Sequence, residues 1–215
     1  MKVGVFDSGI GGLSVVRAIE RDLPAIEVLF RNDSEHMPYG TKSPAEIYTF
    51  IVPIMQSLID EGCAVIVIAC NTVTTTLIKE LRAAFTVPFV AVEPMVKPAA
   101  RLTTSKIIAV CATPTTLASP QYALLKDMYA QNITVLEPDC SDWASMIERQ
   151  QVDNEAISNR INEVIDAGVD VIVLGCTHYH WIEEKIRSIA NGRASVIQPE
   201  AALVRQLQRV LSTLP

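Results

Sequence analysis

Eight short apolar runs, separated by amphipathic stretches, constrain the fold of this 215-residue chain more than any other feature. Such nearly unbroken runs of Val, Ile and Leu are typical of strands in a parallel sheet that is covered on both faces. The predicted strands are residues 3–6, 28–30, 65–69, 89–92, 107–110, 133–136, 171–174 and 195–197. Apolar residues recur at helical spacing in two of the intervening stretches: Ile47, Phe50, Ile54 and Leu58, and then Ile157, Ile161, Val164 and Ile165. The sequence therefore predicts an α/β fold built from βα units.

The chain also resembles itself. Residues 65–70 (Val-Ile-Val-Ile-Ala-Cys) match residues 171–176 (Val-Ile-Val-Leu-Gly-Cys) at an offset of 176 − 70 = 106, and residues 3–8 match residues 108–113 at 113 − 8 = 105. Two matches at nearly one offset predict two pseudo-symmetric lobes, each a mostly parallel sheet flanked by helices, with the active site in the crevice between them. Pro94 and Pro98 suit a boundary. We expect residues 1–97 plus 199–215 to form the first lobe and residues 98–198 the second.

Composition and charge exclude several classes of protein. The net charge is −6 and no basic run or basic-aromatic stripe is present, so nucleic acid is not an expected partner. The apolar runs are far shorter than the roughly 20 residues of a membrane span, and the N-terminus has no signal-peptide pattern. We therefore expect a cytoplasmic protein without a membrane partner.

The five cysteines are an odd number without a Cys-x-x-Cys spacing, which argues against a disulfide framework and a structural zinc site. His178-Tyr179-His180 suggests metal only weakly, because the one other histidine, His36, completes no ligand spacing. No metal is predicted, and the cysteines are best interpreted one by one as free thiols.

Polar residues follow four of the predicted strands. Asp7-Ser8-Gly9 comes after the first strand, Cys70-Asn71-Thr72 after the third, Thr113 to Thr116 after the fifth, and Cys176-Thr177-His178 after the seventh. In open α/β sheets, ligands bind beyond the carboxyl ends of the strands. We expect these side chains to converge on one crevice.

Cys70 and Cys176 occupy matching positions in the repeat, each at the predicted start of a helix. The helix dipole and the free backbone N–H groups favour a thiolate there and lower the thiol pKa. If the lobes are related by a pseudo-twofold axis, the two sulfurs approach a substrate from opposite sides. Inversion at a carbon needs such a pair, one group removing a proton and the other delivering one. The alternative is two ordinary buried thiols.

The neighbouring polar residues allow both structural and functional interpretations. Asp7 is either a turn or helix cap, or a carboxylate that polarises a substrate ammonium group or orients a thiol. His178 is either a solvated residue at a helix start or a group that exchanges a proton with Cys176. Six further residues are plausible caps whose hydroxyl, amide and backbone N–H groups also suit carboxylate binding: Ser8, Asn71, Thr72, Thr113, Thr116 and Thr177.

Two other motifs are less specific. Gly9-Ile10-Gly11-Gly12 is similar to a dinucleotide fingerprint, but Ser14 stands where the third glycine is required, and a tight turn from strand to helix explains the glycines. Pro38-Tyr39-Gly40 is a turn from which Tyr39 could reach the crevice.

Together these segments resemble the glutamate racemases of the aspartate/glutamate racemase superfamily, over nearly the whole chain. The resemblance is carried by residues 4–15 (Gly-Val-Phe-Asp-Ser-Gly-Ile-Gly-Gly-Leu-Ser-Val), 38–40 (Pro-Tyr-Gly), 69–72 (Ala-Cys-Asn-Thr), 92–94 (Val-Glu-Pro) and 174–179 (Leu-Gly-Cys-Thr-His-Tyr). It implies interconversion of L- and D-glutamate without a cofactor or metal, supply of D-glutamate for peptidoglycan, and a homodimer.

The resemblance also implies roles for individual residues. Cys70 and Cys176 correspond to the two catalytic thiols, assisted by Asp7, His178 and Glu148. The residues that it places at the substrate are Ser8, Pro38, Tyr39, Gly40, Asn71, Thr72, Thr113, Thr116 and Thr177.

Three segments depart from the resemblance. Cys140-Ser141-Asp142-Trp143 replaces a Cys-Pro segment, His180 replaces a proline, and Ile197-Gln198-Pro199-Glu200 replaces an Asp-Ser-Gly-like turn. These departures leave three alternatives open: an aspartate or broader-specificity racemase of the same mechanism, a ligand-binding protein without turnover, and, from the glycine motif alone, a nucleotide-binding protein.

Overall fold

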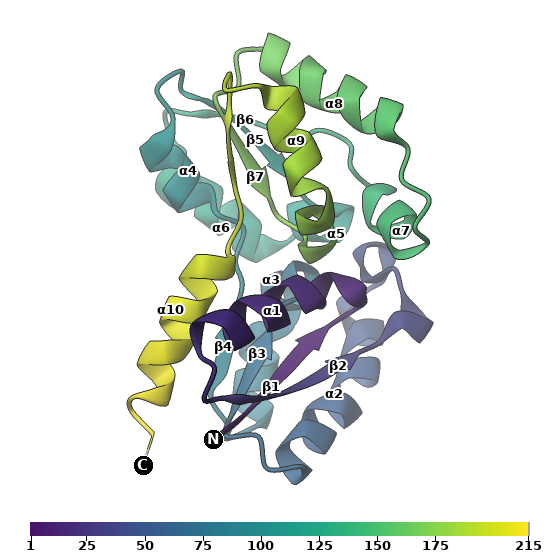
Figure 1. The fold of residues 1–215 in the computed structure, drawn as a ribbon, viewed down its shortest axis with the longest axis vertical. Coiled ribbons are helices and arrows are strands. Elements are labelled where there is room, and N and C mark those ends of the chain that lie inside the picture. Colours follow the sequence, from purple (N-terminus) through teal and green to yellow (C-terminus); the bar gives the residue numbers. More distant parts are fainter. Residues whose placement is uncertain (215) are drawn as a thin grey trace.

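The chain forms two α/β lobes, one above the other in Figure 1. The computed structural model describes residues 1–214. The first lobe holds a sheet of order β2-β1-β3-β4, made of β1 (Lys2–Asp7), β2 (Glu27–Asn32), β3 (Val65–Ile68) and β4 (Phe89–Ala91). The second holds a sheet of order β6-β5-β7-β8, made of β5 (Ile107–Cys111), β6 (Thr134–Leu136), β7 (Val171–Leu174) and β8 (Ser195–Ile197). The eight strands are those predicted from the sequence. The ends of β7 and β8 are as predicted, and no end of the others is shifted by more than two residues.

The two sheets have the same topology. Every strand pair in both is parallel, and β1, β2, β3 and β4 correspond in order to β5, β6, β7 and β8. The internal repeat is thereby confirmed, because its two matches fall on the two central strands of each sheet. Since parallel strands end at one edge, the polar residues after β1 and β3 lie together, as do those after β5 and β7.

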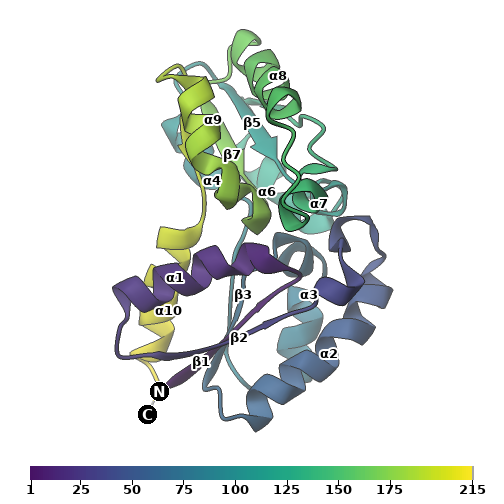
Figure 2. The same cartoon turned by 45° about the vertical axis from the view of Figure 1, so that its right-hand side comes forward.

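Helices cover both faces of each sheet (Figure 2). Around the first sheet lie η1 (Ile10–Gly12), α1 (Leu13–Asp22), η2 (Ser34–His36), η3 (Tyr39–Thr41), α2 (Pro44–Asp60), α3 (Asn71–Ala84) and α10 (Glu200–Leu211), where η marks a 3₁₀ helix. Around the second lie α4 (Val96–Leu102), α5 (Pro114–Leu117), α6 (Pro120–Tyr129), α7 (Trp143–Glu148), α8 (Asn154–Asp166), η4 (Thr177–Ile182) and α9 (Glu183–Ala190).

The buried faces of the helices follow the expected spacing with one shift. In α8 the predicted stripe of Ile157, Ile161, Val164 and Ile165 is buried in the core of the second lobe. In α2 the buried stripe is Ile47, Ile51, Met55 and Leu58, whereas Phe50 and Ile54 are only partly covered. The α2 prediction was therefore wrong by one residue in mid-helix. Every candidate there is apolar, so the sequence could not select the face that packs on the sheet.

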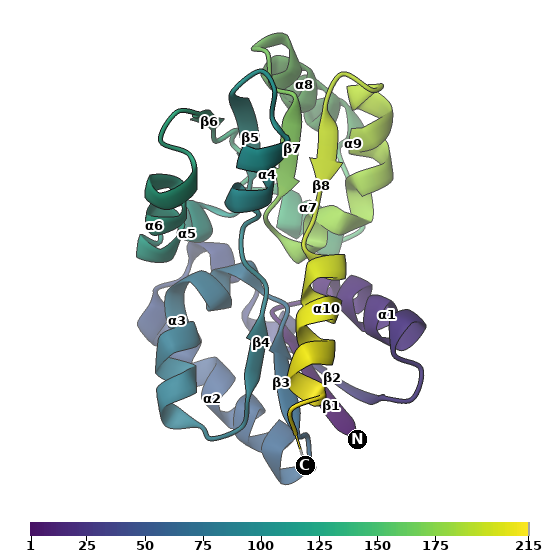
Figure 3. The ribbon, with the colours of Figure 1, turned by 90° about the vertical axis from the view of Figure 1, so that its left-hand side faces the viewer.

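The chain passes between the lobes twice (Figure 3). Residues 92–95 lead from β4 to α4, and Gln198 and Pro199 lead from β8 to α10. Helix α10 then packs on the first lobe, where Leu203, Val204 and Leu207 join the cluster formed by β1 and α1. In residues 1–214, no helix has both the length and the apolar character needed to cross a membrane.

Asp170 fastens the loop between α4 and β5 to the start of β7. Its carboxylate accepts hydrogen bonds from Thr103 Oγ1 (2.6 Å), Thr104 N (2.6 Å), Thr104 Oγ1 (2.8 Å) and Ser105 N (2.8 Å). Burial raises the pKa of this carboxyl, but the hydrogen bonds outweigh that effect and hold the pKa well below its ordinary value of 3.8.

We predict that Asp170→Ala lowers the free energy of unfolding by roughly 1 to 3 kcal/mol at pH 7, because it removes charge-assisted hydrogen bonds to the loop. A carboxyl with a lowered pKa stabilises the fold above its unfolded pKa, and that contribution is lost as the pH falls through the folded pKa. Urea unfolding should therefore show a constant difference from wild type above pH 5 and a smaller one below pH 4. Asp166→Ala, at an exposed carboxylate, is the control; an equal loss in both variants would contradict the prediction.

Candidate active site

A narrow cavity of about 20 Å³ lies between the lobes, at the carboxyl ends of the central strands. That is room for one or two waters. It is lined by Ser8, Met37, Pro38, Tyr39, Gly40, Thr41, Cys70, Asn71, Thr72, Thr113, Ser141, Ala144, Cys176, Thr177 and His178. The crevice predicted from the strand ends is thus present, and both thiols line it.

Cys70 enters the cavity from the first lobe. It follows β3 as the N-cap of α3, is 5% exposed, and its Sγ lies 3.6 Å from Ser8 Oγ. Burial and the negative charge of Asp7 raise the pKa of this thiol to about 12, against the lowering effect of the Val73 N–H and the Ser8 hydroxyl. The prediction that the helix start lowers its pKa is therefore wrong for Cys70, because desolvation exceeds the helix contribution.

Cys176 enters from the second lobe, with a different partner. It follows β7, is 7% exposed, and is the N-cap of the 3₁₀ helix η4, in agreement with the predicted helix start. Its Sγ lies 3.9 Å from His178 Nδ1. Burial lowers the pKa of His178, but its hydrogen bonds to Cys176 and Glu148 outweigh burial and raise it to about 10. The sulfur of Cys176 therefore lies beside a ring that carries a positive charge at neutral pH.

Glu148 connects that histidine to the first lobe. Its Oε2 lies 2.8 Å from His178 Nε2 and accepts the N–H of Ile10 at 3.0 Å, while Oε1 accepts the Ser34 hydroxyl at 2.9 Å. Burial raises the pKa of Glu148, but these hydrogen bonds lower it more, and the net pKa falls below the ordinary value. Glu148 lies outside the cavity lining and contacts the thiol only through His178.

Asp7 lies beneath the cavity and is fully buried. Its carboxylate accepts the N–H groups of Gly9 (3.2 Å) and Gly12 (3.0 Å) and the hydroxyl of Thr177 (3.0 Å). Desolvation raises the pKa of this carboxyl, and the nearby His178 offsets part of the rise. Asp7 therefore shapes the turn after β1 and also reaches across to the segment after Cys176.

The glycines of this turn are explained by close packing. A Cβ at Gly11 would lie 2.7 Å from the backbone nitrogen of His178. The turn lies directly against η4, which leaves no space for a phosphate at this point. The partial glycine motif is thus accounted for without a nucleotide.

Hydroxyl groups join the lobes on the Cys70 side. Thr72 Oγ1 lies 3.0 Å from Thr113 Oγ1 and 3.4 Å from Thr116 Oγ1. Thr116 is fully buried behind the cavity lining. Both side-chain polar atoms of Asn71 are buried without a hydrogen-bond partner. An unpaired buried amide is costly, and this one lies where a bound ligand could pair with it.

The turn at residues 37–41 closes the cavity. The Tyr39 hydroxyl donates to Asp33 at 2.5 Å, and the Thr115 hydroxyl donates to the Gly40 carbonyl across the lobes at 2.6 Å. A Cβ at Gly40 would lie 2.7 Å from the Cβ of Thr113, so only glycine permits this approach.

Some residues of the site escaped the sequence reasoning. Met37, Thr41, Ser141 and Ala144 line the cavity, and Ser34 holds Glu148. Ser141 belongs to the segment that departs from the resemblance, and Met37 and Thr41 flank the Pro-Tyr-Gly turn, so those two motifs were the available signals. No Lys or Arg lines the cavity, and residues 1–214 contain no group of three His, Cys, Asp or Glu suited to a metal.

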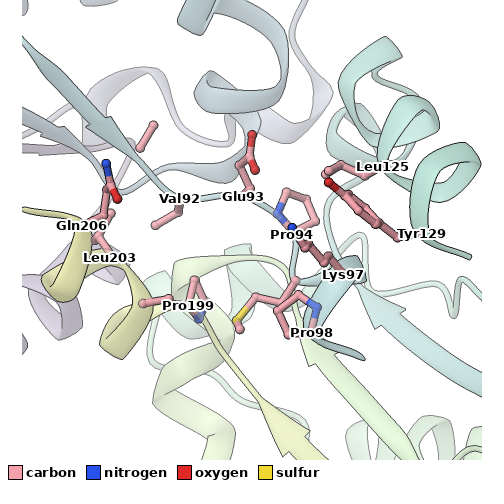
Figure 4. A pocket seen from close by; sticks show the side chains of 13 residues that line it. Val92, Glu93, Pro94, Lys97, Pro98, Leu125, Tyr129, Pro199, Leu203 and Gln206 are labelled. Atoms are coloured by element: carbon pink, nitrogen blue, oxygen red, sulfur yellow. The ribbon is translucent and has the colours of Figure 1, made fainter. Parts of the chain in front are cut away.

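A wider cavity, of about 300 Å³, borders the two chain crossings (Figure 4). Glu93, Lys97 and Tyr129 line it together with Pro199 and Gln206. It contains neither thiol nor histidine, so acid–base chemistry at a carbon is assigned to the narrow cavity.

Comparisons with known proteins agree with this geometry. The family model for Asp/Glu/Hydantoin racemase matches residues 3–207. A glutamate racemase of Ralstonia pickettii is 40% identical over 214 residues, covering 98% of this chain and 76% of that protein. The Escherichia coli glutamate racemase, solved with L-glutamate and the activator UDP-MurNAc-ala, is 30% identical with a TM-score of 0.91, covering 99% of this chain and 82% of the other. The Francisella tularensis glutamate racemase, solved with D-glutamate, is 32% identical with a TM-score of 0.80, covering 98% and 80%.

We predict that Asn71→Leu raises the free energy of unfolding by roughly 1 to 2 kcal/mol, because it removes two buried polar atoms without partners. Urea unfolding measures the change. Thr75→Val is the matched control on α3, since the Thr75 hydroxyl donates to the Asn71 carbonyl at 2.9 Å and its loss should destabilise the protein. A destabilised Asn71→Leu would show that the amide has partners in solution.

We also predict that iodoacetamide at pH 8 modifies Cys176 at least about tenfold faster than Cys70, because the pKa of Cys70 is about 12 whereas Cys176 lies beside an imidazolium. Peptide mass spectrometry measures both rates, and unmodified Cys111, which is fully buried, verifies folding. His178→Gln should slow modification of Cys176 alone.

The raised pKa of His178 predicts how both stability and thiol reactivity depend on pH. The contribution of the protonated His178 ring to folding stability is fully present below about pH 6.5 and is lost as the pH rises through about 10. The reactivity of Cys176 that depends on the imidazolium should therefore persist to pH 9; equal rates for the two thiols would refute this assignment.

Proposed function

Because the chain belongs to the Asp/Glu/hydantoin racemase family, and within it to the glutamate racemases, we propose that Cys70 and Cys176 interconvert L- and D-glutamate by proton transfer at the α-carbon. The chain is an amino-acid racemase, and its substrate is a small molecule. The observation that carries the mechanism is the pair of thiols, which line one narrow cavity from equivalent strand ends of two lobes.

The reaction consists of two proton transfers. A thiolate removes the α-proton from one face, and the electron pair of the C–H bond stays on the α-carbon and its carboxylate. The opposite thiol then delivers its proton to the other face. One C–H bond breaks and one forms, and the two sulfurs have exchanged their protonation states. Proton exchange with solvent restores the starting state.

The two thiols differ in their electrostatic surroundings. Cys70 remains a thiol because burial and Asp7 raise its pKa to about 12, so we propose a resting form in which Cys176, 3.9 Å from the positive ring of His178, is the base. This form accepts the α-proton of the enantiomer that faces Cys176. For the other enantiomer, a proton must first move from Cys70 to Cys176. The positive ammonium group of the substrate assists by offsetting the charge of Asp7.

Neutral donors bind the substrate and stabilise the carbanion. We assign the carboxylates of the substrate to the hydroxyls of Ser8, Thr72, Thr113 and Thr177, the amide of Asn71, and the N–H groups at the start of α3. In so narrow a cavity these dipoles act at low dielectric, which strengthens their effect on developing charge. Pro38, Tyr39 and Gly40 close the cavity, and Thr116 supports Thr72 and Thr113.

Two carboxylates act through other groups. Glu148 fixes His178 through its Nε2, and Asp7 positions Thr177 and the turn after β1. Glutamate does not fit into about 20 Å³, so we infer that the lobes separate to admit it and close again before proton transfer.

We further propose that the enzyme is cytoplasmic, needs no cofactor or metal, and supplies D-glutamate for peptidoglycan. The homodimer implied by the sequence resemblance stays a prediction, as does the division into residues 1–97 plus 199–215 and 98–198. Light scattering of the purified protein tests the dimer.

The test is incubation of the purified protein with L-glutamate in deuterated water. We expect D-glutamate by circular dichroism and α-deuterium by mass spectrometry, both unaffected by EDTA or a carbonyl reagent. Cys70→Ser and Cys176→Ser should each lose at least about a hundredfold in inversion rate. A serine hydroxyl is a far weaker acid than a thiol, so it neither donates a proton nor forms the basic anion as readily. Cys63→Ser, at a buried thiol outside the cavity, should retain turnover.

The same assay separates the alternatives. Faster inversion of aspartate would identify an aspartate or broader-specificity racemase. Neither inversion nor exchange with either amino acid would leave a ligand-binding protein as the better assignment. Inversion that survives both serine substitutions would refute the two-thiol mechanism.

A further inference from the structure

Two departures from the sequence resemblance, His180 and Glu200, meet in the structure. His180 Nδ1 lies 3.0 Å from Glu200 Oε1 and 3.1 Å from Ser14 Oγ. His180 belongs to η4 of the second lobe. Ser14 is the second residue of α1 and Glu200 is the first of α10, and both helices pack on the first lobe. We call these three residues the latch. It joins the lobes beside the second chain crossing.

The latch is buried and ordered by its own hydrogen bonds. The side chain of His180 is 2% exposed and that of Glu200 is 17% exposed. Gln198 orients the carboxylate, since its Nε2 donates to Glu200 Oε2 at 3.2 Å and its Oε1 accepts the Glu200 N–H at 2.6 Å. Burial raises the pKa of Glu200, but the hydrogen bonds from His180 and Ser14 outweigh it and keep the carboxylate charged.

His180 keeps this position although its Nε2 is buried without a partner. The hydrogen bonds of the ring are therefore made through Nδ1 alone, and they must offset the cost of the unpaired nitrogen. The next residue adds a second contact, because the Arg17 guanidinium of α1 lies 4.9 Å from the centre of the Trp181 ring. Two adjacent residues of η4 are thus fastened to the first lobe.

The same short helix carries the Cys176 half of the site. Thr177 and His178 are the first two residues of η4, directly after Cys176, and His180 is two residues further. We propose that the latch positions η4, so that His178 and Cys176 reach the reacting geometry only when the lobes are closed. His180, Glu200 and Ser14 are positioning residues in this proposal, which rests on the two-thiol mechanism proposed above.

The latch lies on one side of the cavity. On the Cys70 side the lobes are joined by other groups, among them the hydroxyl contact of Thr72 with Thr113 and the bond from Thr115 to Gly40. Loss of the latch should therefore slow proton transfer at Cys176 more than at Cys70. A general loss of stability would affect both transfers alike.

Primary isotope effects on kcat/KM separate these cases. Each enantiomer of α-deuterated glutamate presents its deuteron to a different thiol. When transfer at Cys176 slows, removal of the deuteron that faces Cys176 becomes more rate-limiting, and its isotope effect rises. Removal of the other deuteron becomes more reversible, and its isotope effect falls. The Cys176→Ser variant keeps only Cys70. The enantiomer whose α-deuteron this variant exchanges with solvent is therefore the one whose α-deuteron faces Cys70.

The variants are His180→Phe, which keeps an aromatic ring but no ring nitrogen, and Ser14→Ala, which removes the hydroxyl that contacts His180 and the Gly11 carbonyl. We expect kcat/KM to fall roughly tenfold in His180→Phe and less in Ser14→Ala, with opposite changes of the two isotope effects. His180→Asn, whose amide nitrogen can replace Nδ1, should restore much of the rate. Thr115→Val is the matched control, because it removes a hydrogen bond between the lobes on the Cys70 side.

The outcomes distinguish the two levels of the proposal. A wild-type protein without racemisation overturns the proposed function and the latch with it. An active wild type whose latch variants change both isotope effects in one direction, or neither, overturns the latch alone. The latch is supported if the latch variants raise the isotope effect for removal by Cys176 and lower the one for removal by Cys70. Thr115→Val should show neither change, or the reverse changes.

Discussion

The structure depends on one geometric constraint, that parallel strands end at the same edge of a sheet. Each lobe has its two central strands, β1 with β3 and β5 with β7, ending toward the other lobe. A residue directly after any of these strands is therefore delivered to one cavity. The repeat places a cysteine after β3 and another after β7, which gives the two faces of the cavity equivalent thiols.

Neighbouring charged groups then make the equivalent thiols different. Both are buried, and burial alone disfavours a thiolate. At Cys70 the carboxylate of Asp7 adds to this effect, whereas at Cys176 the imidazolium of His178, held by Glu148, opposes it. A pseudo-symmetric backbone thus carries an asymmetric charge distribution. In the proposed mechanism, this asymmetry determines which of the two thiols acts as the first base.

Contacts between the lobes surround the two thiols. Asp7, Glu148 and His180 each reach across the interface, and all three bear on the segment that follows Cys176. The hydroxyl groups of Thr72, Thr113 and Thr115 do the same on the other side. Because the closed cavity has almost no free volume, these contacts also define the state in which water is excluded.

The sequence by itself determined the strands, the repeat, the two thiols and most of the polar residues at strand ends, because hydrophobic periodicity and strand termini are local properties. It did not determine the buried face of α2, where every candidate residue was apolar, nor the high pKa of Cys70, which comes from desolvation and the charge of Asp7. Only the tertiary structure decided that Ser34 holds Glu148, that Ser141 lines the cavity, and that His180 meets Glu200. Such contacts join loops and helix ends far apart in the chain, where no periodicity exists and only the packing of one lobe on the other selects the partners.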